Sequence, residues 1–376
     1  MKEVNKLNSQ NIREIVSISS LESPEHAKNV VPEVLSVSWM IGKRCNYDCS
    51  YCPSWVHDSH SPHLPLKNIN KTIDNISQWT SSNNKKFKMY FTGGEPFIHP
   101  DFLSILKHIN KKHNVYSIGV NTNGSAKLEK YIDSSKYLSN MTISLHLEKS
   151  NKVIKDTIEK IIYINNNTST FTNVNVMAVT GKVDIIPHIV NILDKNQIKF
   201  TVNKIIPTEY DPNREKKISK KEYRNNKKYF DIKSTENYIA DRKTWIEEKI
   251  NKYYKKEELE TIKRYQSLVN WQDTKVYYEN HTEEKNSNEL LNEELTNFTG
   301  WYCYIGIDCI YIDYDGLIYK GNCYADGSIG HISDSSINWP DKPVTCPYNL
   351  CTCNSDIRVR KAKNIKYLDN IINSLN

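Results

Sequence analysis

Three cysteines lie within the eight residues CNYDCSYC, namely Cys45, Cys49 and Cys52. A structural zinc site needs four protein ligands, and no fourth cysteine or histidine follows at the spacing of a zinc finger. A four-iron cluster is bound through one thiolate per iron, so three thiolates leave one iron open to a small molecule. The spacing therefore favours an iron–sulfur cluster with one open position, with a zinc or redox site as the alternative.

The chain has nine cysteines, and the other six follow a long cysteine-free interval: Cys303, Cys309, Cys323, Cys346, Cys351 and Cys353. An odd number of cysteines argues against a framework of disulfides. The chain is expected to be cytoplasmic, where thiols are kept reduced. Both sets therefore point to metal binding or catalysis.

Segments rich in β-branched and aromatic residues alternate with helix-like segments in the first part of the chain. The predicted strands cover residues 34–41, 88–92, 115–120, 141–147, 174–180 and 199–206. The predicted helices cover residues 66–80, 100–112, 125–138, 150–163 and 184–196. This alternation predicts an α/β fold with a parallel sheet, and six strands suit a partial (β/α)6 barrel.

Unusual motifs follow four successive predicted strands. The cysteine loop follows the first, GGEP (93–96) the second and NTNG (121–124) the third, while Ser144 and His146 end the fourth. In parallel βα barrels the carboxyl ends of the strands form one face, where active sites are built. We therefore expect these motifs to meet at one site.

The pattern Cys-x3-Cys-x2-Cys, with Tyr51 before the last cysteine, resembles the signature of the radical S-adenosylmethionine (radical SAM) superfamily, and GGEP resembles its GGE element. The resemblance spans about residues 35–206. It implies that Cys45, Cys49 and Cys52 hold a [4Fe-4S] cluster whose open iron binds S-adenosylmethionine (SAM). It further implies reductive cleavage of SAM to a 5′-deoxyadenosyl radical that abstracts a substrate hydrogen. A flavodoxin- or ferredoxin-type protein would donate the electron.

The same resemblance assigns SAM contacts to residues at the strand ends: Gly93, Gly94, Glu95, Pro96, Asn121 and Ser144. An ordinary Gly-Gly-Glu-Pro turn and polar loop residues are the alternatives. His146 stands where many relatives carry Asp. In the following loop His57 and Asp58 are candidate substrate contacts, although a plain polar loop also explains them and the neighbouring His60 and His63.

The C-terminal cysteines resemble the auxiliary-cluster modules called SPASM and twitch, in which a cysteine-bearing hairpin is followed by further ligands. Residues 301–332 alternate around a DYDG turn, which is typical of a hairpin. The resemblance implies one auxiliary [4Fe-4S] cluster in a twitch-like module. The expected ligands are Cys303, Cys323, Cys351 and Cys353, with Cys346 next; Cys309 is expected to be a buried free thiol. A structural zinc site is the rival interpretation.

Composition restricts the partners. The net charge is +7, but the excess is spread thinly, so nucleic acid is not an expected partner. No apolar run approaches the roughly 20 residues that span a bilayer, and the N-terminus lacks the apolar core of a signal peptide. The predicted segments are an N-terminal extension (1–33), the barrel (34–207), a charged helical linker (208–300), a twitch-like domain (301–356) and a C-terminal helix (357–376).

Three functions are compatible with these features. The first is oxidation or rearrangement of a small molecule by an oxidoreductase- or mutase-type radical SAM enzyme, which the short auxiliary module favours. The second is maturation of a ribosomally made peptide, as in many SPASM relatives. The third is a non-enzymatic zinc-binding interaction protein.

Overall fold

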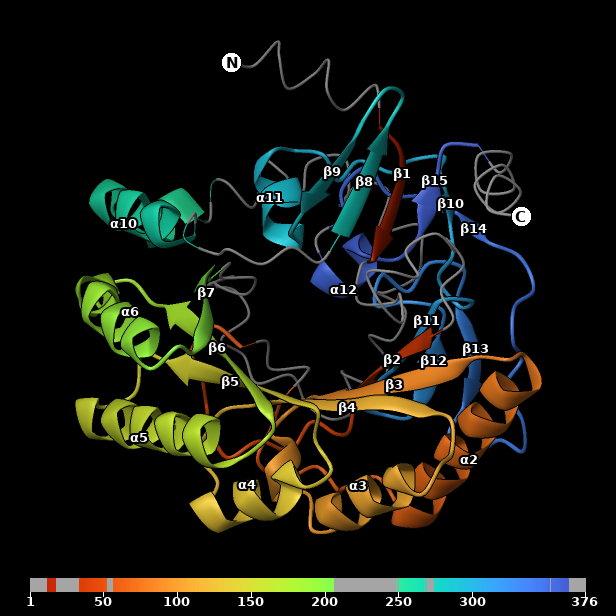
Figure 1. Cartoon of the computed structure of the whole chain (residues 1–376), viewed down its shortest axis with the longest axis horizontal. Coiled ribbons are helices and arrows are strands. Elements are labelled where there is room, and N and C mark those ends of the chain that lie inside the picture. The colour runs from red at the N-terminus through yellow and green to blue at the C-terminus, as the bar shows by residue number, and fades with distance from the viewer. Residues whose placement is uncertain are drawn as a thin grey trace.

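The computed structural model describes residues 12–17, 34–52, 57–205, 248, 250–266, 268, 274–351 and 353–364. Figure 1 shows a curved sheet whose outer face is covered by helices, and a second sheet that lies across its open side. Much of the predicted extension (1–33), linker (208–300) and C-terminal helix (357–376) lies outside the described residues.

The curved sheet contains the six predicted strands in chain order, each parallel to its neighbour. They are β2 (Val34–Met40), β3 (Lys86–Thr92), β4 (Val115–Thr122), β5 (Asn140–His146), β6 (Phe171–Ala178) and β7 (Lys199–Lys204). The helices between them are α2 (Leu66–Ser82), α3 (Phe102–Asn110), α4 (Leu128–Ser135), α5 (Asn151–Asn167) and α6 (Ile186–Lys195). The α/β fold with a partial barrel is confirmed.

The two faces of this sheet differ in chemistry. Along β5, Met141, Ile143 and Leu145 are buried in the core under the helices. The alternate positions Thr142 and Ser144 are half-buried and belong to the inner face. Buried parallel sheets usually have apolar residues on both faces, so a polar inner face indicates a solvated interior.

The predicted hairpin around the DYDG turn is present as β11 (Cys309–Ile312) and β12 (Leu317–Tyr319), followed by β13 (Ser328–His331). Strand β11 pairs in parallel with β2, so the hairpin extends the barrel sheet to nine strands. An uncovered β2 would expose a row of unpaired backbone groups. The hairpin therefore continues the barrel sheet beyond β2.

The second sheet joins segments from both ends of the chain. Its order is β14 (Val344–Thr345), β10 (Tyr302–Cys303), β15 (Lys361–Ala362), β1 (Ile12–Ser17), β8 (Thr274–Tyr278) and β9 (Thr282–Lys285). The expected boundaries at residues 33 and 300 thus separate strands that pair with one another. Helices α10 (Lys256–Gln266), α11 (Ser287–Asn292) and α12 (Asn354–Ile357) complete the described elements.

The predicted C-terminal helix needs a correction over its described part. Helix α12 ends at Ile357, and residues 361–362 form β15 instead of continuing a helix. Pairing of β15 with β1 and β10 satisfies its backbone groups. This pairing depends on segments far away in the sequence, which local helical patterning does not encode.

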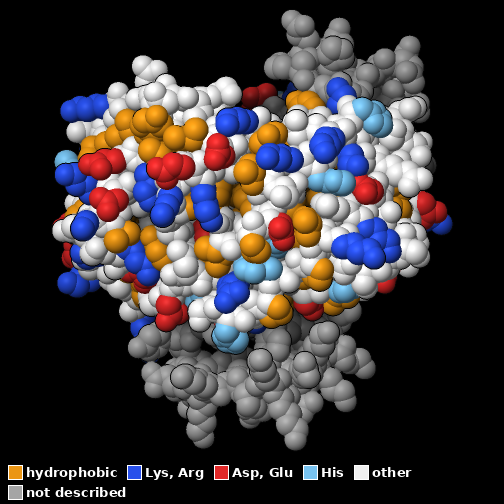
Figure 2. Space-filling model, turned by 90° about the horizontal axis from the view of Figure 1, so that it is seen from below, with side chains coloured by type: hydrophobic (Ala, Val, Ile, Leu, Met, Phe, Trp, Pro, Cys, Tyr) orange, Lys and Arg blue, Asp and Glu red, His pale blue; other side chains and the backbone are white. Residues whose placement is uncertain are grey.

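The surface shows two further features. No helix among the described residues is long and apolar enough to cross a membrane. On the face in Figure 2, Lys and Arg side chains intermingle with Asp and Glu. Positive charge is therefore not gathered into one continuous patch on that face.

Candidate active site

The cysteine loop begins at the end of β2 and is fixed by the GGEP segment that follows β3. The backbone N–H of Gly94 donates to Gly42 O (2.8 Å), and that of Glu95 donates to Arg44 O (2.9 Å). A Cβ on Gly94 would lie 2.1 Å from Arg44 O, and one on Gly93 would lie 2.6 Å from Gly42 O. The two glycines therefore allow one loop to pack directly on the other.

The Glu95 side chain ties this segment to the end of β4. It is 3% exposed. Its carboxylate accepts hydrogen bonds from Phe97 N (3.0 Å), Thr122 Oγ1 (2.8 Å) and Asn123 N (2.7 Å). Burial raises the pKa of Glu95 to about 7, although these donors oppose the rise. The neighbouring Pro96 is buried and starts the 3-10 helix Pro96–Ile98. The side chains of Glu95 and Pro96 are thus both buried, and that of Glu95 is hydrogen-bonded to the protein.

The NTNG segment contacts the cysteine loop through Asn123, which the sequence analysis did not single out. Its Nδ2 donates to Asn46 Oδ1 (3.0 Å) and lies 3.8 Å from Cys45 Sγ. Asn46 in turn donates to Ser125 Oγ (2.8 Å). The sequence feature that could have singled out Asn123 is its position in a polar turn directly after a buried strand.

The predicted pair Asn121 and Ser144 lies side by side on neighbouring strands. Ser144 Oγ donates to Asn121 Oδ1 (3.2 Å), and both residues are half-buried. This hydrogen bond fixes the direction of the asparagine amide. The two side chains therefore present a defined polar surface at the ends of β4 and β5.

The end of β5 contacts the second half of the cysteine loop. His146 Nδ1 lies 3.5 Å from Cys49 Sγ and forms a hydrogen bond with the Tyr51 hydroxyl. Glu148 accepts hydrogen bonds from Ser50 N (3.2 Å) and Ser50 Oγ (2.8 Å). Burial lowers the pKa of His146 to about 4, so the imidazole is neutral at pH 7.

The residues of the loop fit an iron–sulfur cluster. Cys45 Sγ accepts a hydrogen bond from Tyr47 N–H (3.4 Å) and faces the Asn123 amide. Hydrogen bonds to sulfur are among the features by which proteins tune such clusters. Within the described residues, no three Cys, His, Asp or Glu side chains converge closely enough to hold a single metal ion.

The loop after the cysteines is held by contacts with itself, with the cysteine loop and with His99. Asp58 pairs with the start of the cysteine loop through its backbone, accepting from Cys45 N (2.7 Å) and donating to Lys43 O (3.0 Å). Its carboxylate accepts from the backbone of His60 (3.0 Å) and Ser61 (2.6 Å). His63 packs on His99 with ring centroids 4.7 Å apart. His57 Nε2 lies 3.3 Å from Asp48 Oδ1. These contacts favour the plain polar loop.

The six C-terminal cysteines gather from separate segments. Cys303 and Cys309 are buried in one small core, against which Cys323 and Cys346 pack. Burial raises the pKa of all six thiols, and the negative charge of Asp356 adds to the rise at each of them. Asn322 connects two of these segments, because its Nδ2 donates to Cys353 Sγ (3.1 Å) and its N–H donates to Asp356 Oδ1 (3.1 Å).

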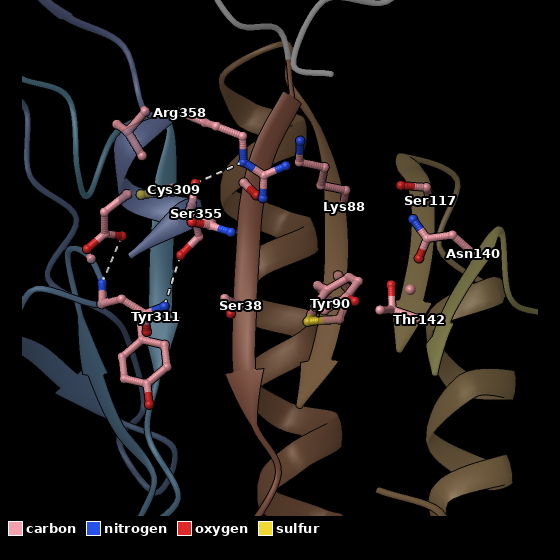
Figure 3. Close-up of a pocket in the computed structure, with 18 of the residues that line it drawn as sticks. Ser38, Lys88, Tyr90, Ser117, Asn140, Thr142, Cys309, Tyr311, Ser355 and Arg358 are labelled. Carbon is pink, nitrogen blue, oxygen red and sulfur yellow. Dashed lines mark hydrogen bonds between the residues drawn. The ribbon is translucent and has the colours of Figure 1, made fainter. Parts of the chain in front are cut away.

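A cavity of about 680 Å³ separates the polar face of the barrel from these C-terminal segments. Figure 3 shows polar residues of β2 to β5 on one side and residues of the C-terminal segments on the other. The labelled lining residues are Ser38, Lys88, Tyr90, Ser117, Asn140, Thr142, Cys309, Tyr311, Ser355 and Arg358. This cavity was not predicted from the sequence, although polar residues alternate along the strands that line it.

Sequence comparisons place the chain among known proteins. Residues 39–175 match the family described as Radical SAM superfamily. A GTP 3',8-cyclase of Clostridium perfringens (strain SM101 / Type A) is 25% identical over 174 residues, which are 44% of this chain and 53% of that protein. An S-adenosylmethionine-dependent nucleotide dehydratase of Selenomonas ruminantium is 32% identical over 92 residues, 24% of this chain and 31% of that protein. The match thus spans at most about half the length of these relatives, 53% in the first.

Two solved structures are similar at a lower level. Streptococcus suis SuiB bound to precursor peptide SuiA has a TM-score of 0.45 and 16% identity, covering 90% of this chain and 68% of that one. Native anSMEcpe with bound AdoMet has a TM-score of 0.46 and 15% identity, covering 80% and 78%. The superfamily implies a four-iron cluster and SAM as cofactors. The chain therefore carries a radical SAM domain, at residues 39–175.

Proposed function

We propose that the chain is an enzyme that reductively cleaves SAM and abstracts hydrogen from a small polar molecule bound in the barrel cavity. The product would be an oxidised or rearranged substrate, formed with the help of an auxiliary cluster. One observation carries the proposal. The cavity is bounded by the polar face of the barrel and by segments that bear C-terminal cysteines, including Cys309.

In this proposal Cys45, Cys49 and Cys52 hold the four-iron cluster. When bound, the cluster and SAM supply the one-electron cleavage that gives methionine and the 5′-deoxyadenosyl radical. The loop is kept in place by the Gly93–Gly94 packing and by the Glu148 hydrogen bonds with Ser50. Because the protein then supplies mainly binding and orientation, these contacts matter for the rate.

Contacts to SAM are assigned to the strand ends. The acceptors of Glu95 are used within the protein, so residues 93–96 would contact SAM through their backbone. Asn121 and Ser144 offer an amide and a hydroxyl that are oriented by their mutual hydrogen bond. His146 forms a hydrogen bond with the hydroxyl of Tyr51, which belongs to the cysteine loop.

The lining of the cavity supports a small substrate rich in hydrogen-bond donors. A volume of about 680 Å³ is in the range of small-molecule sites. Among the described residues, Asn140 Oδ1 and Asn173 Oδ1 are buried without a hydrogen-bond partner, and both residues line the cavity. An unsatisfied buried polar atom costs about 1 to 3 kcal/mol. A ligand with hydroxyl or amino groups would recover that energy.

The backbone makes room for one of these groups. A Cβ on Gly119 would lie 2.0 Å from Asn140 Oδ1 and 2.6 Å from Tyr90 Cδ2. Gly119 therefore lets the Asn140 amide and the Tyr90 ring occupy the inner face of the sheet. The position of these two side chains supports a polar binding surface inside the barrel rather than a packed core.

The names of the sequence relatives agree with a small polar substrate. The two relatives above are named for reactions on GTP and on nucleotides. Their matches cover 44% and 24% of this chain, so they support the substrate class without naming the substrate. The alternative function is maturation of a peptide, and the experiment below distinguishes it from action on a small molecule.

An auxiliary [4Fe-4S] cluster is the proposed role of the second cysteine set. Cys303, Cys323, Cys351 and Cys353 are the proposed ligands, with Cys346 next. Cys346 packs on two neighbouring small cores, of which one contains Cys303 and contacts Cys323 and the other contacts Cys351, and this supports one shared site. Cys309 Sγ donates to Lys320 O (3.5 Å), which suits a buried free thiol.

The proposal is tested by anaerobic reconstitution with iron and sulfide, followed by SAM and dithionite. Wild-type protein is expected to release 5′-deoxyadenosine, and Cys45→Ala to release none while keeping its thermal unfolding transition. Release by Cys45→Ala, or none by wild type, would overturn the proposal. The small-molecule fraction of a cell extract should raise the release. A rise with the peptide fraction alone would replace the small substrate by a peptide.

A further inference from the structure

The charged residues that line the barrel cavity are mostly basic. The cations are Lys88, Lys199, Arg358 and Arg360, and the carboxylates are Asp308 and Asp356. Arg360 is ion-paired with Asp308, with its Nε 2.9 Å from Oδ2 and its Nη2 3.2 Å from Oδ1. These two charges offset each other, so the pair adds no net charge to the cavity.

The second carboxylate also has a cation beside it. Lys361 is 1% exposed, and its Nζ donates to the backbone carbonyls of Asp356 (2.6 Å), Ile357 (3.0 Å) and Val359 (2.8 Å). A buried positive charge therefore lies next to Asp356. The other cations of the lining then give the cavity a net positive charge.

Two serine hydroxyls flank Lys88 on the neighbouring strands. In the register of the sheet, Ser36 on β2 pairs with Lys88 on β3, and Lys88 pairs with Ser117 on β4. All three residues are half-buried and line the cavity, and Figure 3 shows Lys88 and Ser117 on this wall. Neighbouring strands lie about 4.8 Å apart. The three side chains therefore form one row of hydrogen-bond donors.

Arg358 reaches the same wall from the opposite side of the cavity. It follows α12, and its Nε donates to Asn354 O (3.0 Å). Burial raises the pKa of Tyr90, and both the Thr142 hydrogen bond and the positive charge of Arg358 oppose that rise. Tyr90 is the next residue after Lys88 on the same face of β3, about 7 Å further along the strand. Arg358 and Lys88 therefore serve the same part of the cavity.

We propose that this part of the cavity binds a terminal phosphate group, so that the substrate is a phosphorylated small molecule. The inference deepens the proposed function and rests on it. A terminal phosphate has three strong acceptor oxygens, which match an ammonium group, a guanidinium group and two hydroxyls. Arginine binds phosphate through two parallel hydrogen bonds, and lysine binds it as a point charge. A carboxylate has only two oxygens and would leave part of this donor set unused.

The phosphate would mark the end of the substrate that does not react. Lys88 lies four residues before Thr92, where β3 ends, which is about 13 Å along the strand. The SAM contacts are assigned to the strand ends, so the reacting C–H bond would point that way. The unsatisfied amide oxygens of Asn140 and Asn173 would accept hydrogen bonds from the part of the substrate in between.

The anion site is tested by calorimetric titration of the full reconstituted chain with inorganic phosphate, and with acetate at the same ionic strength. Wild type should bind phosphate more tightly than acetate. Lys88→Gln and Arg358→Gln should each weaken phosphate binding roughly ten- to hundredfold. Lys107→Gln is the control, because Lys107 is exposed on α3, on the other side of the sheet.

Lys88→Arg separates loss of the charge from a damaged fold. This variant keeps the positive charge and should bind phosphate, while Lys88→Gln should not, although both keep the thermal unfolding transition of wild type. Equal phosphate affinity in wild type and Lys88→Gln, no binding of phosphate by wild type, or tighter binding of acetate would overturn the inference.

A second experiment connects this site to the substrate. The small-molecule fraction of the cell extract is treated with alkaline phosphatase, which removes terminal phosphate groups, and the phosphatase is filtered off. The treated fraction should no longer raise 5′-deoxyadenosine release, whereas a fraction treated with heat-inactivated phosphatase should. Full stimulation by the treated fraction would overturn the phosphorylated substrate and leave the proposed function in place. No release by wild type would overturn the proposed function, and the phosphate titration would then decide the anion site.

Discussion

The two cysteine sites are built in opposite ways. Cys45, Cys49 and Cys52 belong to one loop, which contacts from the ends of three neighbouring strands hold in place. The second set comes from strands of two different sheets and from separate loops. The first site is specified by local spacing, whereas the second exists only after distant segments have paired.

The acids at the two sites differ in the same way. Glu95 has three hydrogen-bond donors from the protein and acts as a link between loops. Asp356 accepts a hydrogen bond from Asn322 N (3.1 Å), and Asn322 Nδ2 donates to Cys353 Sγ (3.1 Å). Glu95 thus links two loops of the first site, whereas Asp356 belongs to a hydrogen-bond network that reaches one cysteine of the second.

The largest expected effect comes from breaking the packing at the first site. Gly94→Ala would place a Cβ 2.1 Å from Arg44 O and shift the cysteine loop. A misplacement of about 1 Å can cost on the order of 100-fold in rate, so 5′-deoxyadenosine release should fall by about that factor. Iron at the second site should stay in place.

Gly327→Ala is the matched control. Gly327 has a positive φ (+75°), which Gly94 does not have, but a Cβ there would meet nothing within 4 Å. It should therefore release 5′-deoxyadenosine at close to the wild-type rate. Equal rates for Gly94→Ala and Gly327→Ala would show that the loop packing is not needed.

A smaller effect is expected from the cavity that lies between the sites. Gly119→Ala would drive a Cβ into the Asn140 amide. Loss of one such hydrogen bond is worth about 1 kcal/mol, or roughly five- to tenfold. The stimulation of 5′-deoxyadenosine release by the small-molecule fraction should weaken by about this factor. Full stimulation in Gly119→Ala would argue against binding at this wall of the cavity.

The smallest effect concerns stability of the second sheet. Glu14 on β1 is fully buried, and burial raises its pKa from 4.5 to about 7. Between these values the folded protein keeps a proton that the unfolded chain loses, so the free energy of unfolding falls as pH rises from 4.5 to 7. Glu14→Gln removes this loss and should raise Tm by about 2 to 4 °C at pH 8.

The same variant should match wild type near pH 4.5, where the glutamate is protonated in the folded protein. Glu279→Gln, an exposed glutamate beside β8, serves as the control and should leave Tm unchanged at both pH values. A Tm difference between Glu14→Gln and wild type that is equal at pH 4.5 and pH 8 would rule out ionisation as its cause.

Local patterns predicted most of the barrel and named the cysteines of both proposed sites. The six strands and the DYDG turn follow from β-rich runs and turn chemistry, which act over a few residues. The pairing of β11 with β2, and of β1 with β8 and β15, joins segments far apart in the sequence. Such pairing has no local signature.

The finer roles were also beyond the sequence. GGEP predicts a cofactor contact, which stays a prediction, and the structure adds that Gly94 packs on the cysteine loop. Asn123 and Asp356 gain their meaning from what they contact after folding. A single Asp or Asn in a polar segment carries no such information by itself.

The most direct test of two separate cluster sites is the iron content of three reconstituted proteins, measured with Mössbauer spectra. Wild type should hold about eight irons, as two four-iron clusters. Removing Cys45, Cys49 and Cys52 should leave about four, and so should removing Cys303, Cys323, Cys351 and Cys353. About four irons in wild type, with none left after the loop cysteines are removed, would contradict the account.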